Sequence, residues 1–338
     1  MSRLSYLNWF ARGMVPTFWS HLVEMNRAER YLPSLELAQA WSEHGPAMTM
    51  VPLHSRGIRY VQNSLKIRRA HGQRWGEAQS LNFLGMALYT AGRLQEAVIV
   101  LEQAAAIFER TGDWWEENLV HYQQGLAHYQ LGNLDKAVEL SERVHRSGIE
   151  LGDEQASGIS LYCWAMASQG KVPADIVQIE LNRERADAQC TAQVLLAEAV
   201  RLYYANDLVS ASERLDEAKL VIRKNTLRSV YVAPVYSWRA TVLRNRLRNE
   251  SSGGSLNKEL LRRTKQALRA ARFIAWSYPV ERPHALREAG ELAELQGYHQ
   301  KAVTFLKASL AEADRLDMSC QTEWTRRRLA EIQETLSG

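Results

Sequence analysis

Cysteine is scarce in this chain of 338 residues, with only Cys163, Cys190 and Cys320. The three lie far apart, are odd in number and form no C-x-x-C pair. We therefore expect no disulfide framework, and each thiol is best interpreted as a small side chain buried in a helix. This usage is typical of a reducing compartment, so we predict a cytoplasmic protein.

Long uncharged hydrophobic runs are also lacking. Aromatic residues gather at the N-terminus, but Arg12 and Pro16 interrupt them, and no uncharged span of 18 residues occurs. A membrane helix needs about 20 apolar residues, so we predict no membrane partner. The aromatic cluster would cap the fold or contact an upstream domain or a second copy of the chain. Its members are Tyr6, Trp9, Phe10, Phe18 and Trp19.

The motifs that commonly mark catalytic or cofactor sites are missing. The sequence has no G-x-x-x-x-G-K-S/T, no G-x-G-x-x-G and no H-E-x-x-H. His121 and His128 would share a helical face, but their separation along the helix is about 10 Å, too far to share one metal ion. We therefore predict no catalytic residue, no metal and no cofactor, and that this chain is not an enzyme.

What the sequence does contain is a repeat with a period of 40 residues. His71-Gly72-Gln73, Thr111-Gly112-Asp113 and Leu151-Gly152-Asp153 follow one another at this interval. Small residues between them recur at the same interval, namely Gly85 with Gly125, Gly92 with Gly132, and Ala97 with Ala137. A fixed period in this range indicates stacked units, each of which buries its apolar face against its neighbours.

Each unit has the pattern of two helices. Leu81, Leu84 and Leu88 fall on one helical face, and Gly92 stands where a left-handed residue would end that helix. A second helix then runs from Leu94 to the next glycine-containing tripeptide. With few prolines and no convincing alternating strand, the sequence predicts an all-α fold. We expect an α-solenoid of about six to seven helix pairs that forms an open, curved trough.

The spacing of small residues within a unit is more specific. Gly85 and Ala97 are twelve residues apart, and Gly290 and Ala302 repeat this spacing near the C-terminus. It resembles the helix–turn–helix unit of the tetratricopeptide repeat (TPR), in which such residues let two antiparallel helices approach closely. The period of 40 exceeds the usual TPR length of about 34 and approaches that of HEAT and armadillo arrays, but the glycine–alanine spacing favours TPR.

The first 170 residues carry a second resemblance. The stretch from Asn26 to Gly45, continuing through Gly57, Trp75 and Asp153, is similar to helical-repeat segments found C-terminal to P-loop ATPase modules in large bacterial signalling proteins. That resemblance implies a sensing or docking segment. The chain lacks the catalytic modules of those proteins, so their enzymatic activity is not implied.

The repeat pattern divides the chain into four parts. Residues 1–53 would form an N-terminal helical cap and a degenerate first repeat, and residues 54–224 the TPR-like repeats. A basic, degenerate helix pair with a flexible connector at 249–257 would occupy 225–280. A terminal TPR-like repeat and a capping helix would fill 281–338.

In TPR superhelices the first helix of each unit faces the concave side, and its inward positions form ladders at the repeat spacing. We expect these side chains to bind an amphipathic helix or an extended peptide, since Tyr and Met give contact area with adaptable packing. Alternatively, some of them pack between adjacent helices as ordinary core. The candidate groove residues are Asn82, Met86, Tyr89, Tyr122, Leu126, Tyr129, Tyr162, Met166 and Tyr203.

Charge is unevenly distributed. Between Arg223 and Arg272 there are 13 Lys and Arg residues against two acids, a local charge of +11, so the rest of the chain sums to −7. A basic patch formed by Arg262, Arg263, Arg269 and Arg272 would meet an acidic partner, although solvated convex faces explain the same residues. We do not expect nucleic-acid binding, because domains of that kind usually carry a higher overall charge.

These patterns favour a non-catalytic scaffold or sensor that binds a protein or peptide in its groove, within a regulatory assembly. A regulatory domain gated by a small ligand is the alternative. Nucleic-acid binding through residues 223–272 is the weaker one.

Overall fold

The computed structural model describes residues 7–8, 13–31, 33–251 and 256–337, and within them the regular elements are all helical. The predicted all-α fold is therefore confirmed. The helices are α2 (Met14–Ala28), α3 (Leu35–Thr49), α4 (His54–Ala70), α5 (Arg74–Thr90), α6 (Leu94–Thr111), α7 (Trp114–Leu131), α8 (Leu134–Leu151), α9 (Glu154–Ala167), α10 (Ala174–Asn182), α11 (Ala188–Tyr204), α12 (Leu208–Lys224), α13 (Pro234–Asn249), α14 (Lys258–Ser277), the short 3-10 helix η1 (Pro279–Glu281), α15 (Arg282–Leu295), α16 (His299–Arg315) and α17 (Ser319–Ser337).

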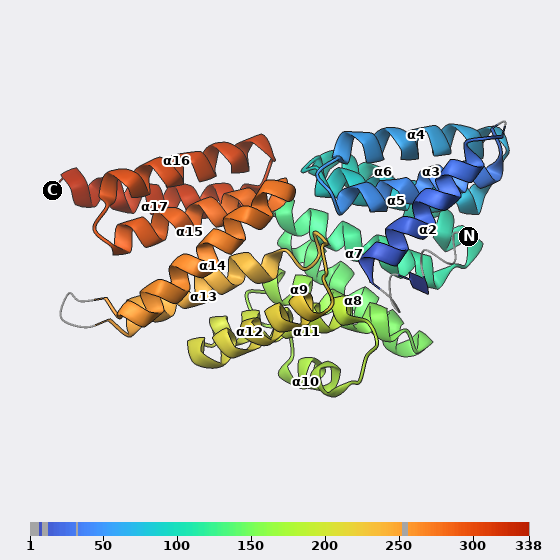
Figure 1. The fold of residues 1–338 in the computed structure, drawn as a ribbon. Coiled ribbons are helices and arrows are strands. Elements are labelled where there is room, and N and C mark those ends of the chain that lie inside the picture. Colours follow the sequence, from blue (N-terminus) through green and yellow to red (C-terminus); the bar gives the residue numbers. More distant parts are fainter. Residues whose placement is uncertain (1–6, 9–12, 32, 252–255, 338) are drawn as a thin grey trace.

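Successive helices pack in antiparallel pairs that stack side by side (Figure 1). The first pair is α3 with α4 and the last is α15 with α16, which makes seven pairs in the described residues. Helix α2 precedes these pairs and α17 follows them. The first helix of each pair also contacts the first helix of the next. The predicted α-solenoid of six to seven pairs is thus confirmed.

The repeated tripeptides fix where helices end and begin. Gly112 and Gly152 adopt left-handed backbone angles, with φ of 69° and 68°, directly after α6 and α8. The next residue then caps the following helix: Asp113 accepts from the Glu116 N–H, and Asp153 accepts from the Gln155 N–H. One short motif therefore stops one helix and starts another.

The small residues allow close packing within a pair. A Cβ on Gly85 of α5 would lie 2.4 Å from Leu101 Cδ2 of α6, so only glycine fits there. Gly290 of α15 has the same relation to Leu306 of α16, at 2.8 Å from its Cγ. Tight pairs of this kind keep the stack regular over its length.

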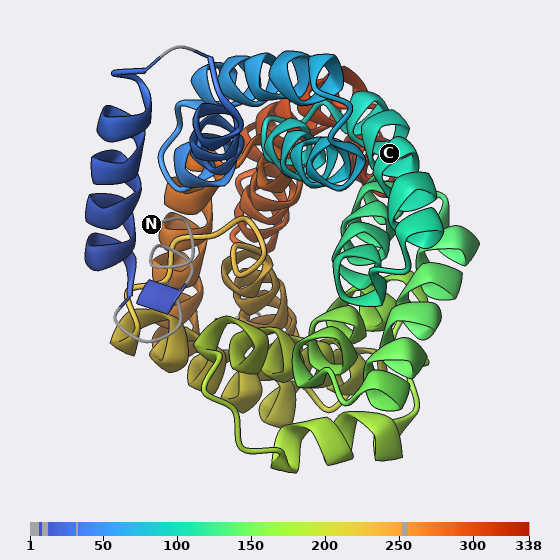
Figure 2. The ribbon, with the colours of Figure 1, turned by 90° about the vertical axis from the view of Figure 1, so that its right-hand side faces the viewer.

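The stack completes a full circuit, so its C-terminal end returns to its N-terminal half (Figure 2). Helix α17 contacts α7, and η1 contacts α5. A Cβ on Gly92, at the end of α5, would come within 2.5 Å of Leu316 Cδ2. The sequence predicted an open trough, and this part of the prediction is wrong. The turns of the superhelix meet and surround the concave side.

Two of the predicted internal boundaries, 53/54 and 224/225, fall between helices, whereas the third, 280/281, falls within η1. The limit between residues 53 and 54 separates α3 from α4, which pack together as one pair. The connector predicted at 249–257 lies between α13 and α14, and its central residues 252–255 are outside the described residues. Among the helices of the described part, none is long and apolar enough to cross a membrane.

Candidate functional site

The concave side of the circuit holds a cavity of about 890 Å³. Most of its wall comes from the first helices of the pairs α3, α5, α7, α9 and α11. Helix α2 covers one side, and part of the link between α12 and α13 (residues 228–231) completes the lining. The lining residues are Thr17, Phe18, His21, Gln39, Glu43, Pro46, Ala47, Thr49, Met50, Trp75, Gln79, Asn82, Phe83, Met86, Trp115, Glu116, Leu119, Tyr122, Gln123, Gln155, Ile159, Gln189, Arg228, Ser229, Val230 and Tyr231.

The lining residues of α5 form one helical stripe. Trp75, Gln79, Asn82, Phe83 and Met86 stand at i, i+4, i+7, i+8 and i+11, so all five point to the same side of the helix. Forty residues later in α7, the first four of these positions are taken by Trp115, Leu119, Tyr122 and Gln123, which also line the cavity. The repeat therefore places equivalent side chains of successive helices around one space.

A polar network connects α3, α4, α5 and α7 beside the cavity. Arg68 of α4 donates to Gln39 Oε1 and, at 3.4 Å, to Gln79 Oε1. Gln39 donates its Nε2 to Glu43 Oε1 at 2.7 Å, and Gln79 is hydrogen-bonded to Glu116. The network thus brings two carboxyl groups, from α3 and α7, to the cavity wall through amides and a single guanidinium.

Burial changes the acidity of both carboxyl groups. It raises the pKa of Glu43 to about 7, against the hydrogen bond from Gln39. Burial and the neighbouring Asp113 carboxylate raise the pKa of Glu116 to about 7. Near neutral pH each group is therefore close to half protonated, and a bound cation would favour the ionised form.

The wall of the cavity contains buried polar atoms that lack hydrogen-bond partners. Gln123 donates its Nε2 to Asn82 Oδ1 at 2.7 Å, but its own Oε1 has no hydrogen-bond partner although the residue is only 4% exposed. Glu43 Oε2 and the hydroxyl of the buried Tyr231 also lack partners. An unmatched buried polar atom costs about 1–3 kcal/mol. These atoms have almost no accessible surface, so a ligand would gain from them where the side chains turn toward the cavity.

Tyr122 connects the link between α12 and α13 to α7. Its ring packs 5.5 Å from the ring of Tyr231, measured between centroids. Its hydroxyl lies 3.2 Å from the Tyr162 hydroxyl and accepts a hydrogen bond from Gln193 Nε2 at 2.5 Å. The contact between the two rings attaches residues 228–231 to the wall of the cavity.

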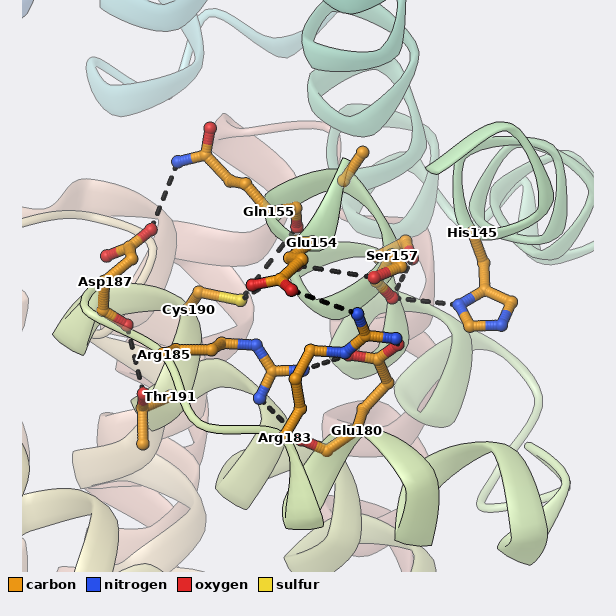
Figure 3. A network of polar contacts seen from close by, with 12 residues as sticks. His145, Glu154, Gln155, Ser157, Glu180, Arg183, Arg185, Asp187, Cys190 and Thr191 are labelled. Atoms are coloured by element: carbon orange, nitrogen blue, oxygen red, sulfur yellow. Dashed lines mark hydrogen bonds and ion pairs between the residues drawn. The ribbon is translucent and has the colours of Figure 1, made fainter. Parts of the chain in front are cut away.

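A second network positions the α9–α11 side of the wall (Figure 3). Asp187, the cap of α11, accepts from the Gln189 N–H at 2.9 Å and from Gln155 Nε2 at 3.1 Å. The carboxylate of Glu180, fully buried at the end of α10, pairs with Arg185 in the following loop. Both interactions fix the loop before α11 and so the two glutamines, Gln155 and Gln189, that face the cavity.

The predicted groove residues separate into three groups. Asn82, Met86 and Tyr122 line the cavity. Tyr203 is partly buried, and its hydroxyl accepts from Asn245 Nδ2 at 3.1 Å. The remaining five are core side chains, each at most 6% exposed, and none lines the cavity: Tyr89, Leu126, Tyr129, Tyr162 and Met166. For these five the alternative interpretation, packing between adjacent helices, matches their burial.

The predicted basic patch is largely paired within the protein. Arg262 bonds to Glu259, and Arg263 bonds to Asp216 at 2.8 Å. The guanidinium of Arg272 lies over the Phe305 ring, 5.3 Å from its centroid. Arg269 is exposed on the same helix. The acid partners reduce the positive charge that α14 offers to another molecule.

The histidine pair on α7 was considered as a metal site in the sequence analysis. His121 lies 3.6 Å from Glu117, and burial lowers its pKa to about 4, so it is neutral near pH 7. The described residues contain no group of three or more potential metal ligands.

In the aromatic N-terminus, Phe18 lines the cavity and Trp19 is exposed on α2. Tyr6, Trp9 and Phe10 are outside the described residues.

Sequence reasoning missed several cavity residues that a repeat ladder contains. Trp75, Trp115 and Gln155 follow one another at 40-residue intervals, as do Gln79, Leu119 and Ile159. Both ladders lie closer to the start of each first helix than the predicted ladders, which begin at Asn82, Met86 and Tyr89. Residues 228–231 could not be found in this way, because they belong to no repeat.

Comparisons with known proteins support the repeat assignment at one place in the chain. Residues 78–111, most of α5 and all of α6, match the tetratricopeptide repeat family. A search of curated proteins finds no match.

Two solved structures are similar over most of the chain. One is a tetratricopeptide repeat protein from Parabacteroides merdae ATCC 43184, with 12% identity and a TM-score of 0.42 over 88% of this chain and 98% of that one. The other is yeast Tom70, with 15% identity and a TM-score of 0.47 over 98% of this chain and 63% of that one. The chain is a helical-repeat protein that carries a tetratricopeptide repeat at residues 78–111.

Proposed function

We propose that the chain is a non-catalytic scaffold or sensor domain that binds a segment of a partner protein in the cavity on its concave side. The observation that carries this proposal is the cavity itself, which is lined from six helices and is surrounded by the circuit. Its place would be in a regulatory assembly, in line with the resemblance of residues 1–170 to repeat segments of bacterial signalling proteins.

The chemistry of the wall supports a peptide as the ligand. Amide side chains line the wall, and a carboxamide group matches the N–H and C=O of a peptide backbone. Those of Gln79, Asn82 and Gln123 already bond to one another or to Arg68 and Glu116, but an amide oxygen accepts two hydrogen bonds and an amide NH₂ donates two. Aromatic and thioether groups, among them Trp115 and Met86, provide apolar contact with adaptable shape. A volume of about 890 Å³ accommodates a short extended segment rather than a folded domain.

Peptides selected from a random phage-displayed library on the wild-type protein provide the test. Met86→Trp fills part of the cavity, and we expect it to weaken binding of the selected peptides at least tenfold. Ile99→Trp is the matched control, because Ile99 is 54% exposed on α6 and does not line the cavity. If both variants bind as the wild type does, the peptides bind elsewhere and the proposal fails.

A second candidate function is gating by a small molecule. Enclosure within the circuit favours it, since the cavity volume falls within the range of about 300–1,000 Å³ that is common for small-molecule sites. A metabolite that raises the melting temperature of the wild type but not of Met86→Trp would support this candidate.

Binding of an acidic partner or of nucleic acid by α14 has less support. Arg262 and Arg263 already pair with acids of the same chain. Phosphate-driven binding would fall steeply with the logarithm of salt concentration, whereas binding in the cavity would change little.

A further inference from the structure

We propose that the cavity selects ligands that carry an alkyl cation, either the guanidinium or ammonium group of a bound peptide or a free alkylamine. The proposal rests on the proposed function and names the chemistry that the same site recognises. Three independent features of the wall support it: unpaired acceptor atoms, two carboxyl groups and several aromatic faces.

The unpaired atoms of the wall call for a donor. Gln123 Oε1 and Glu43 Oε2 are acceptors without a partner, and neither can be satisfied by an acceptor-rich anion. The hydrogen bond from Gln123 Nε2 to Asn82 occupies the donor side of this amide and leaves its oxygen without a donor. A guanidinium presents five N–H donors and an ammonium three, so either group would satisfy these oxygens.

The charges around the carboxyl groups favour a cation. Glu43 has the Glu24 carboxylate as a neighbour, and Glu116 has Asp113. Arg68 contributes one positive charge to both, but its guanidinium already donates to Gln39 and Gln79. The network therefore contains more acidic groups than basic ones, and a ligand cation would bring it closer to neutrality.

The arginine that lines the cavity comes from another part of the wall. Arg228 belongs to the link between α12 and α13 and is exposed. Burial raises the pKa of Tyr278 to about 12, and the positive charge of Arg228 partly opposes this shift, whereas the charges that act on Glu43 and Glu116 are those of other residues. Arg228 does not neutralise the acids of the α3–α7 wall.

Aromatic rings complete a site for a cation. Trp75 and Trp115 stand at equivalent positions of α5 and α7, and Phe83 and Tyr122 lie on the same stripes. The ring faces attract a cation with about 0.5–2 kcal/mol each, most when the cation is desolvated. The alkyl stem of a lysine or arginine would pack against the same rings.

Two synthetic heptapeptide libraries test the proposal, one with arginine and one with citrulline at the centre of otherwise degenerate sequences. Citrulline has the shape of arginine without its charge. We expect the immobilised wild-type protein to retain at least ten times more of the arginine library than of the citrulline library. Glu116→Gln and Glu43→Gln should each reduce this preference severalfold, and circular dichroism checks that both variants fold.

Glu117→Gln is the matched control for the acid variants. Glu117 is adjacent to Glu116 on α7, but its Oε1 bonds to Arg143 at 2.6 Å and it does not line the cavity. We expect it to retain the full preference for arginine. A loss of preference in Glu117→Gln equal to that in Glu116→Gln would overturn the assignment to the cavity acids.

The other outcomes separate this proposal from the proposed function. Equal retention of both libraries by the wild type, lost in Met86→Trp, would overturn the cation selectivity and leave peptide binding intact. Retention that survives Met86→Trp would overturn both. A third outcome is that neither library is retained, while spermidine raises the melting temperature of the wild type but not of Glu116→Gln. That result would support the cation site with a free amine as its ligand and would overturn peptide binding.

Discussion

The Nε2 of His54 lies 3.0 Å from the carbonyl oxygen of Ser277, although 223 residues separate them in the chain. This contact joins the start of α4 to the end of α14, where the superhelix closes on itself. Stacked repeats otherwise contact only their neighbours. Closure therefore adds long-range contacts to a fold whose stability would be local without them.

Leu316→Asp should open the circuit. Leu316 is 3% exposed and lies against the end of α5, so a charge there is left without a partner in the seam. We expect small-angle scattering to show a larger radius of gyration while circular dichroism shows the same helix content. Leu220→Asp is the control, because Leu220 is 64% exposed on α12. Equal radii for Leu316→Asp and the wild type would mean that the seam does not depend on this side chain.

Tyr162→Ala should destabilise the protein by about 3–5 kcal/mol, because Tyr162 is 1% exposed and its ring is among the largest fully buried side chains. Tyr162→Phe removes only the hydroxyl contact with Tyr122 and should cost about 1 kcal/mol. Urea denaturation measures both. A Tyr162→Ala variant as stable as the wild type would show that this ring is not part of the core.

Glu281 predicts a pH dependence of stability. The side chain is 4% exposed and accepts from Ser237 Oγ at 2.7 Å, and burial raises its pKa to about 7. Because the folded pKa lies above the unfolded one, this group stabilises the fold at low pH and that stability is lost as pH rises toward 7. Glu281→Gln should therefore exceed the wild type in unfolding free energy at pH 8, by about 2–3 kcal/mol, and by much less at pH 5. A difference independent of pH would contradict the assigned titration.

Binding of a cation in the cavity should also depend on pH. Glu116 faces Asp113, Gln79, Asn82 and Arg68, and burial raises its pKa to about 7. Only the ionised carboxyl attracts a cation fully, so the affinity for an arginine-centred peptide should rise between pH 6 and pH 8. Titration calorimetry at these two pH values measures the change, which should shrink in Glu116→Gln.

Much of the fold could be predicted because its signals are local. Gly112 and Asp113 stop one helix and start the next through their own backbone and side-chain preferences, and the repeat shows the same solution every 40 residues. Closure could not be predicted. It depends on small rotations between successive pairs, which add up over the whole stack and are set by packing such as that of Gly148 of α8 against Ser157 of α9.

The site could be predicted only in part. Asn82 and Tyr122 were found because their ladder follows the repeat, but Tyr162, at the next position of that ladder, is buried. Its ring packs edge-on against Tyr122, and the link between α12 and α13 also enters the concave space, where its Tyr231 packs against Tyr122. Such a segment has no helical period, so the sequence offers no signal that it would enter the groove.

Methyl NMR of the methionines tests the central claim most directly. Met50 and Met86 line the cavity. Met318 is buried, with 1% of its surface exposed, and does not line the cavity. Titration with a library-selected peptide should shift the Met50 and Met86 methyl signals with one saturating curve and leave Met318 unchanged. Saturable binding that leaves both cavity methyl signals in place would contradict the account.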